Sequence, residues 1–152
     1  MNQVNGKIKE SAQVEQALKA AQATLQKLPL MGPVVWLYTN SPAHKHLFLV
    51  DLEWLLMPPL MLNQSKLYMQ NEAPLAYLSW AKVSPEVGAR LRCGNARLAP
   101  HEWNCGDEIW LIDIVAPFGG GEAILQDLQS NLFSGSKVHF LEATKGTEKQ
   151  NN

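Results

Sequence analysis

An apolar run with one carboxylate inside it constrains the fold of this chain more than any other feature. Residues Glu108 to Val115 read EIWLIDIV, which is apolar on both faces apart from Asp113. Such a run is typical of a central strand that is covered on both sides. Pro117 ends the run, and residues 123–133, after a glycine-rich segment, have apolar side chains at helical spacing. The sequence therefore predicts a strand, a glycine loop and a helix within an α/β domain.

Length and charge exclude several classes of protein. The chain has 152 residues, of which 46% are hydrophobic, enough for one domain with a core but not for two. A net charge of −1 argues against a nucleic-acid partner. The polar N-terminus lacks a secretory signal, and the longest uncharged apolar stretches, Pro29 to Tyr38 and Trp54 to Leu62, are short of the roughly 20 residues that span a bilayer. We therefore expect a cytoplasmic protein without a membrane span.

The N-terminal part predicts an amphipathic helix over residues 9–28, ended by Pro29. Its apolar residues recur at spacings of three and four along one face: Val14, Leu18, Ala21, Leu25 and Leu28. This narrow stripe can pack on the rest of the chain or on a second copy in a homodimer, and we favour the first. We expect residues 1–30 to form a helical extension, residues 31–143 the domain and residues 144–152 a disordered tail.

Further elements follow from periodicity and from proline positions. A second helix is expected from Leu47 to Leu56, ended by Pro58 and Pro59. The other expected elements are two strands joined by a hairpin turn at residues 71–74, a short helix and a last strand: Leu60 to Gln70, Leu75 to Ala81, Pro85 to Leu91 and Lys137 to Leu141.

Asp113 is the first candidate for chemistry, because an ionised carboxylate among apolar neighbours is costly without a partner. It can point into a loop or accept backbone N–H bonds, or it can orient a histidine and stabilise its charged form. His44 and His46 form an HxH pair that can bind zinc, but no third ligand is suitably spaced, so we expect no metal.

The loop of Gly119, Gly120 and Gly121 is the second candidate. At a strand-to-helix junction it presents backbone N–H groups, which suit a phosphate or an oxyanion. It matches neither a P-loop nor GxGxxG, so a flexible turn is an equally good interpretation.

Three blocks together resemble a known family. The first runs from Gly32 through Trp36-Leu37 to Ser41-Pro42-x-His44-Lys45, the second is Ala76-Tyr77-x-Ser79-Trp80-Ala81, and the third runs from Trp103 through Gly106-Asp107, Trp110 and Asp113 to Ala116-Pro117-Phe118-Gly119. Their order and spacing are similar to those of the toxin-activating lysine acyltransferases of RTX cytolysins. The resemblance covers about residues 31–125, and residues 1–30 extend beyond the family's usual start.

The resemblance implies a fold and an activity. The family is similar to GNAT acyltransferases, so we expect a GNAT-like α/β (α+β) fold with a mostly antiparallel central sheet flanked by helices. Its members transfer a fatty acyl group from acyl carrier protein to internal lysines of an RTX protoxin. The family's essential His and Asp fall on His44 and Asp113, and Ser41 matches the Ser of its Ser-Pro-x-His motif. The glycine loop lies where GNAT enzymes hold a pantetheine-linked donor, and Lys45 is a candidate contact for the acidic carrier. No bound cofactor is expected.

The mechanism that this implies begins with a lysine that must lose a proton before it can attack. A histidine can accept that proton when a carboxylate orients it, so His44 is expected to be the general base, or itself the acyl carrier, with Asp113 as its orienting partner. Two alternatives remain: a non-catalytic escort that binds the toxin, and a GNAT-type acetyltransferase that uses acetyl-CoA.

Overall fold

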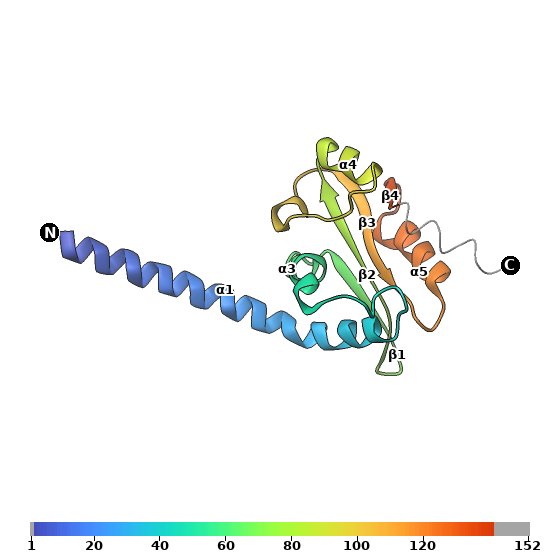
Figure 1. The fold of residues 1–152 in the computed structure, drawn as a ribbon, viewed down its shortest axis with the longest axis horizontal. Coiled ribbons are helices and arrows are strands. Elements are labelled where there is room, and N and C mark those ends of the chain that lie inside the picture. Colours follow the sequence, from blue (N-terminus) through green and yellow to red (C-terminus); the bar gives the residue numbers. More distant parts are fainter. Residues whose placement is uncertain (1, 142–152) are drawn as a thin grey trace.

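A four-stranded sheet organises the chain. The computed structural model describes residues 2–141, and within them the strands lie in the order β1-β2-β3-β4 (Figure 1). Neighbours pair antiparallel except for β4, which is parallel to β3. The predicted α/β fold with a mostly antiparallel sheet and flanking helices is confirmed, while its GNAT-like character stays a prediction. The strands are β1 (Ser65–Gln70), β2 (Ala73–Val83), β3 (Glu108–Val115) and β4 (Val138–Phe140).

The central strands follow the predicted pattern closely. Strand β3 has the predicted bounds, and β1 and β2 form the predicted hairpin. Asn71 and Glu72 connect them with φ of 49° and 64°, the left-handed conformation that two-residue hairpin turns require. The turn is therefore shorter than predicted, because β2 already begins at Ala73. Strand β1 begins later than predicted, since the residues before it are helical.

Helix α1 (Asn2–Thr39) corrects the prediction that Pro29 ends the first helix. It runs through both Pro29 and Pro33. Each proline removes one backbone hydrogen bond, but the last turns of α1 bury Val34, Leu37 and Tyr38 against the domain. This burial offsets the lost bonds. The boundary expected at residue 30 falls inside this continuous helix, and the division into extension and domain stays a prediction.

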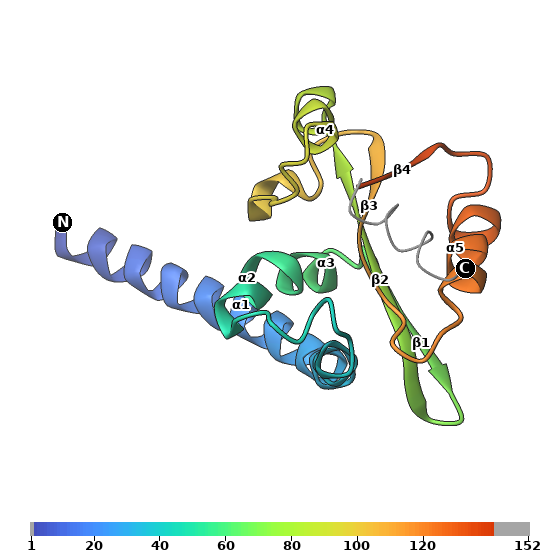
Figure 2. The same cartoon turned by 45° about the vertical axis from the view of Figure 1, so that its right-hand side comes forward.

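The first part of α1 projects away from the sheet (Figures 1 and 2). Its apolar stripe therefore does not pack on the rest of the chain, contrary to the interpretation we favoured: Val14, Leu18 and Leu25 are 55%, 59% and 60% exposed. The helix is also not a membrane span, because no helix among residues 2–141 is long and apolar enough to cross a bilayer.

The second predicted helix is broken into short pieces: η1 (Leu49–Asp51), α2 (Leu52–Leu55) and α3 (Met57–Met61). The prediction that Pro58 and Pro59 end a helix is wrong, because they lie in the first turn of α3. Backbone N–H groups in a first turn have no partner within the helix, so proline is tolerated there. Both prolines are buried.

Two apolar clusters lie on opposite faces of the sheet. One joins the end of α1, α2 and α3 to Tyr77, Trp110 and their neighbours on β2 and β3. The other joins Leu78 and Leu111 to α5 (Gly121–Asp127) and the π-helical turn η3 (Leu128–Leu132). Figure 2 shows α1 to α3 on one side of the sheet and α5 on the other. The predicted helix 123–133 thus begins two residues earlier and changes to a π turn at Leu128.

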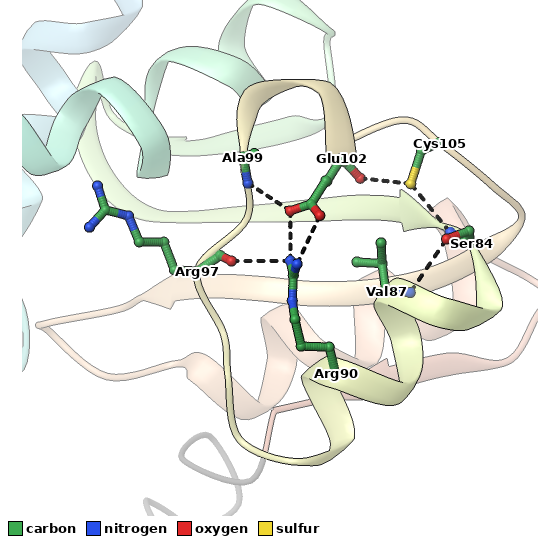
Figure 3. A network of polar contacts seen from close by, with 7 residues as sticks. All are labelled: Ser84, Val87, Arg90, Arg97, Ala99, Glu102 and Cys105. Carbon is green, nitrogen blue, oxygen red and sulfur yellow. Dashed lines mark hydrogen bonds and ion pairs between the residues drawn. The ribbon is translucent and has the colours of Figure 1, made fainter.

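A network of polar contacts joins Arg90, Ala99 and Glu102 (Figure 3). Arg90 on α4 (Pro85–Arg92) donates to both carboxylate oxygens of Glu102 at 2.8 and 2.6 Å. Glu102 also accepts from the backbone N–H of Ala99 at 2.8 Å, at the start of η2 (Pro100–Glu102). The network fixes the loop between α4 and β3.

The predicted short helix at residue 85 is confirmed, and the tail predicted to be disordered lies outside the described residues.

Candidate active site

A β-bulge turns Asp113 toward α1. The pairing of β2 with β3 passes from Ser79↔Asp113 to Trp80↔Leu111, which leaves Ile112 as the extra residue. Side chains alternate between the faces of a regular strand, so Ile112 and Asp113 would point to opposite faces. With the bulge, Ile112 packs in the cluster that contains the end of α1, and Asp113 bonds to Tyr38 of that helix. A bulge is a common device for redirecting one side chain.

Four side chains form a continuous chain of short polar contacts. The Tyr38 hydroxyl donates to Asp113 Oδ2 at 2.6 Å, and His44 Nε2 lies 2.7 Å from Asp113 Oδ1. Ser41 Oγ lies 2.7 Å from His44 Nδ1. The ring of Tyr38 also stacks on that of His44, with centroids 4.8 Å apart and planes inclined by 5°. The structure thus brings together the predicted residues Ser41, His44 and Asp113.

The turn after α1 positions two of these side chains. The backbone N–H groups of His44 and Lys45 both donate to the carbonyl of Ser41, at 3.0 and 2.9 Å. Asn40 closes the end of α1 by donating from its side chain to the carbonyl of Trp36 at 2.8 Å. The tight turn places Ser41 and His44 on the same side, which is why a Ser-x-x-His spacing can bring a hydroxyl to Nδ1.

Hydrogen-bonding capacity assigns the protons in this chain. A carboxylate has only acceptor atoms, so His44 Nε2 carries a proton and donates to Asp113. Nδ1 of a neutral ring is then the acceptor, and Ser41 donates to it. Burial, and then the negative charge of Asp113, raises the pKa of Tyr38 well above its ordinary value, so this hydroxyl stays a donor. His44 and Asp113 are themselves largely buried, with 12% and 10% of their side chains exposed.

Two further hydroxyl groups lie beside Asp113. Ser79 is its partner across the ladder, and Tyr77 packs edge-on against Tyr38. Both hydroxyl groups are buried, and neither makes a hydrogen bond of good geometry, although the hydroxyl groups of Ser65 and Ser79 lie close to that of Tyr77. Burial raises the pKa of Tyr77, the nearby Ser65 hydroxyl lowers it in part, and the charge of Asp113 raises it further. Tyr38, Tyr77 and Ser79 were not among the predicted site residues, although the last two lie in the second of the three sequence blocks.

Other predicted residues lie outside this chain of contacts. Lys45 is exposed beside His44, and His46 is exposed as well. Gly119 and Gly120 adopt φ of 92° and 81° at the start of α5, and the loop contacts α1 through Phe118, whose ring lies 5.5 Å from that of Trp36. Within residues 2–141, the hydrogen bonds that link Tyr38, Ser41, His44 and Asp113 do not involve the loop. Within residues 2–141, no three His, Cys, Asp or Glu side chains are grouped as metal ligands.

Comparison with known proteins places this site in a family. A sequence model described as HlyC, the RTX toxin acyltransferase family, matches residues 23–152. The leukotoxin-activating lysine-acyltransferase LktC of a Pasteurella haemolytica-like species is 35% identical over 99 residues, 65% of this chain and 60% of LktC. The lysine-acyltransferase RtxC of Vibrio cholerae is 34% identical over 125 residues, 78% of this chain and 80% of RtxC. The protein-lysine myristoyltransferase HlyC of Escherichia coli is 34% identical over 101 residues, 64% of this chain and 57% of HlyC.

The individual relatives match only part of this chain, whereas the family model matches residues 23–152. This chain spans about 60% of the length of LktC, and its residues 1–22 lie outside the family match. The family match contains Ser41, His44 and Asp113, together with the bulged strand and the end of α1. The chain belongs to the RTX toxin acyltransferase family.

Proposed function

We propose that this chain is a protein-lysine acyltransferase that transfers a fatty acyl group from acyl carrier protein to lysine ε-amino groups of an RTX protoxin. The observation that carries the proposal is the buried contact of His44 with Ser41 and Asp113 at 2.7 Å on each side. A histidine held in this way can accept a proton and hold the resulting charge. Membership of a family whose relatives are named lysine acyltransferases supports the same reaction.

In the proposed reaction, the neutral lysine amine attacks the carbonyl carbon of the donor thioester. A C–N bond forms, and the amine proton passes to Ser41 Oγ as the hydroxyl proton of Ser41 moves to His44 Nδ1. Asp113 then faces an imidazolium at 2.7 Å, which stabilises the charge. Collapse of the tetrahedral intermediate breaks the C–S bond, and the leaving thiolate is protonated by the imidazolium of His44, which returns to its neutral form. The products are an amide and a free carrier thiol.

Two covalent routes compete with direct attack. In one, His44 carries the acyl group; the bonds to both of its ring nitrogens argue against this route, because one would have to break first. In the other, Ser41 is acylated with His44 as its base, as in a Ser-His-Asp triad. Single-turnover reactions with labelled donor and no lysine substrate separate the routes. Label that stays on the protein contradicts direct attack, and peptide mapping then distinguishes Ser41 from His44.

The oxyanion and the carrier also need partners. Backbone N–H groups of the loop at Gly119 to Gly121 are our candidates for the oxyanion or the pantetheine, as donors at a helix start. Lys45 is our candidate for the acidic carrier, because it is exposed beside His44, whereas Arg90 and Arg92 are paired with Glu102 and Glu108. If carrier docking is electrostatic, KM for the loaded carrier rises with salt.

The test of the function compares donors and histidine variants. The full chain is incubated with myristoyl-loaded acyl carrier protein and a protoxin polypeptide, and lysine acylation is measured by mass spectrometry. We expect acylation by the wild type, near-complete loss in His44→Ala, and wild-type rates in His46→Ala, whose side chain is exposed nearby. Acylation from acetyl-CoA alone would contradict the carrier as donor. Full toxin activation by His44→Ala would instead favour an escort without catalysis.

A further inference from the structure

A hollow opens beside His44 between α1 and the segment that follows it. It has a volume of about 160 Å³, and Tyr38 and His44 are among the residues that line it. Most of its wall is apolar: Val35, Leu47, Phe48, Leu49 and Leu52. Lys45 is the one permanently charged residue among those that line it. The hollow therefore offers an apolar surface that leads directly to the candidate general base.

Three consecutive apolar side chains extend this surface into solvent. Phe48, Leu49 and Val50 are 76%, 85% and 65% exposed. Their backbone is nevertheless fixed: Asp51 accepts from the N–H of Phe48 at 2.8 Å and from the indole N–H of Trp54 at 3.0 Å. A fixed, exposed and contiguous apolar patch is typical of a binding surface.

We propose that this acyl groove, formed by the hollow and residues 48–50, binds the fatty acyl chain of the donor. The inference rests on the proposed function, because the thioester carbonyl must lie near His44 during transfer. A hydrocarbon chain matches the five apolar side chains of this wall, and the polar residues that also line the hollow are Tyr38, Thr39, His44 and Lys45. The hollow is smaller than the roughly 300 Å³ or more of pockets that enclose whole ligands, so it covers the first methylenes and Phe48, Leu49 and Val50 cover the rest. A relative named a myristoyltransferase uses a long saturated chain.

The test compares donors of different chain length. In the double variant Phe48→Ser, Leu49→Ser, we expect the ratio of kcat/KM for a C14 donor over a C4 donor to fall at least tenfold, because the short chain reaches little of the exposed patch. Met69→Ser is the matched control, since Met69 is also exposed, at 50%, but lies on β1. It should leave the ratio unchanged. An unchanged ratio in the double variant overturns the acyl groove.

A binding measurement separates failure of the groove from failure of the proposed function. The wild type and the double variant are titrated with carrier protein bearing a non-transferable C14 or C4 thioether. We expect the wild type to bind the C14 form at least tenfold more tightly than the C4 form, and the double variant to lose this preference. Lack of catalysis together with this preference would refute the function and keep the groove. Equal binding of both forms by the wild type would refute the groove.

A separate observation concerns the exposed stripe of α1. Ser11, Val14, Leu18, Ala21, Leu25 and Leu28 alternate at spacings of three and four, the 3.5-residue period of a coiled-coil seam. The apolar members of this seam are exposed, although they face the same side of one helix. At about 1.5 Å per residue, the seam from Ser11 to Leu28 is about 27 Å long, or roughly two and a half heptads. A periodic seam of this kind is matched by another helix with the same period.

We infer that the partner is α1 of a second copy, packed antiparallel. In a parallel pair, Glu10 would face Glu15 of the partner, a contact between like charges. The antiparallel pair with Val14 opposite Leu25 and Leu18 opposite Ala21 instead places Glu15 near Gln22. Glu15 also stays bonded to Lys19 of its own helix at 3.0 Å. The antiparallel pair sets the two sheets at opposite ends of the coil.

Sedimentation equilibrium of the full chain tests this dimer. We expect a concentration-dependent dimer for the wild type and a monomer for the double variant Leu18→Gln, Leu25→Gln. Leu30→Gln is the matched control, because Leu30 is 41% exposed on the same helix but lies off the seam. It should dimerise like the wild type. A wild-type monomer at every concentration, or a double variant that dimerises equally well, overturns the inference. A charge reversal, Glu15→Lys, that tightens the dimer would contradict the antiparallel orientation.

Discussion

Asp113 is the residue on which the candidate site depends, because each of its carboxylate oxygens holds a different partner. Oδ1 accepts from His44 and Oδ2 from Tyr38, at 2.7 and 2.6 Å. The two bonds hold the carboxylate beside His44, and the Tyr38 ring stacks on the imidazole as well. Tyr38 therefore positions the pair through both its hydroxyl and its ring.

Replacing Asp113 by Asn tests its orienting role. The amide has one donor and one acceptor group, so it cannot accept from both Tyr38 and His44. The imidazole then favours the wrong tautomer, and we expect kcat to fall about 10²- to 10⁴-fold. Thermal unfolding should show a folded domain. Wild-type kcat in a folded Asp113→Asn would contradict the proposed mechanism.

Replacing Tyr38 by Phe removes its hydroxyl and keeps its ring on His44. One charge-assisted hydrogen bond is lost, so we expect kcat to fall about tenfold with KM little changed. Tyr68→Phe is the matched control, because the Tyr68 hydroxyl bonds to Asp127 rather than to Asp113. Steady-state kinetics with the loaded carrier measure both. An equal effect in the two variants would mean that Tyr38 acts only through stability.

Part of this site could be predicted from the sequence. A carboxylate within an apolar strand needs a polar or charged partner wherever the strand lies, so a partner for Asp113 could be predicted from the sequence alone. The choice of His44 and Ser41 depended on the resemblance, because no local pattern spans 69 positions. Tyr38 was missed because it ends an apolar segment and looks like a core residue. Its hydroxyl became relevant only when α1 packed next to the bulge.

The elements followed the sequence where local signals decide them. Strand β3, the hairpin and α4 have short-range patterns and were found. Helix α1 and the pair α2 and α3 were misjudged because proline rules describe an isolated helix. Burial of Val34 and Leu37, both 0% exposed, outweighs the bonds that Pro29 and Pro33 remove, whereas Pro58 and Pro59 lie in the first turn of α3, where no helical bond is lost. No sequence pattern marks the bulge at Ile112, because its neighbours in the strand are apolar apart from Asp113. The face toward which Asp113 points could therefore not be predicted.

Gly106 provides a test at the scale of elements. It lies between η2 and β3, and its N–H lies 3.2 Å from the carbonyl of Lys82. A Cβ atom here would overlap the backbone of Val83 and Ser84. We therefore expect Gly106→Ala to lower the free energy of unfolding by about 3 kcal/mol. In Gly121→Ala the nearest atom is 3.9 Å away, so stability should change by less than about 1 kcal/mol. Urea denaturation compares them, and equal effects would contradict the close approach.

At the scale of the whole molecule, the sheet separates two environments. The face with α5 is apolar apart from its rim, where Lys66 and Tyr68 bond to Asp127. The face with α1 buries the hydroxyl groups of Tyr38, Tyr77 and Ser79 around Asp113. Grouping buried polar atoms on one face has a cost, because the hydroxyl groups of Tyr77 and Ser79 make no hydrogen bond of good geometry. The cost should be visible in how stability depends on pH.

At alkaline pH, the ionisation of the buried tyrosines largely determines how the free energy of unfolding changes with pH. Burial raises the pKa of Tyr77 above its ordinary value of 10.0. As the pH rises past 10, the phenol ionises in the unfolded chain but stays protonated in the fold, so the unfolded state is favoured. Each such group lowers the free energy of unfolding by about 1.4 kcal/mol per pH unit until the folded pKa is reached.

Tyr77→Phe isolates this contribution, because Phe cannot ionise and also removes a buried hydroxyl that makes no hydrogen bond of good geometry. We expect the variant to be at least as stable as the wild type at pH 7. Between pH 10 and pH 11.5 its stability should fall less steeply, by about 1 kcal/mol per pH unit on average. Urea denaturation across this range measures both slopes, with Tyr38 still titrating in each protein. Parallel slopes would show that Tyr77 ionises equally easily in the folded and unfolded chains, and that the face around Asp113 admits water.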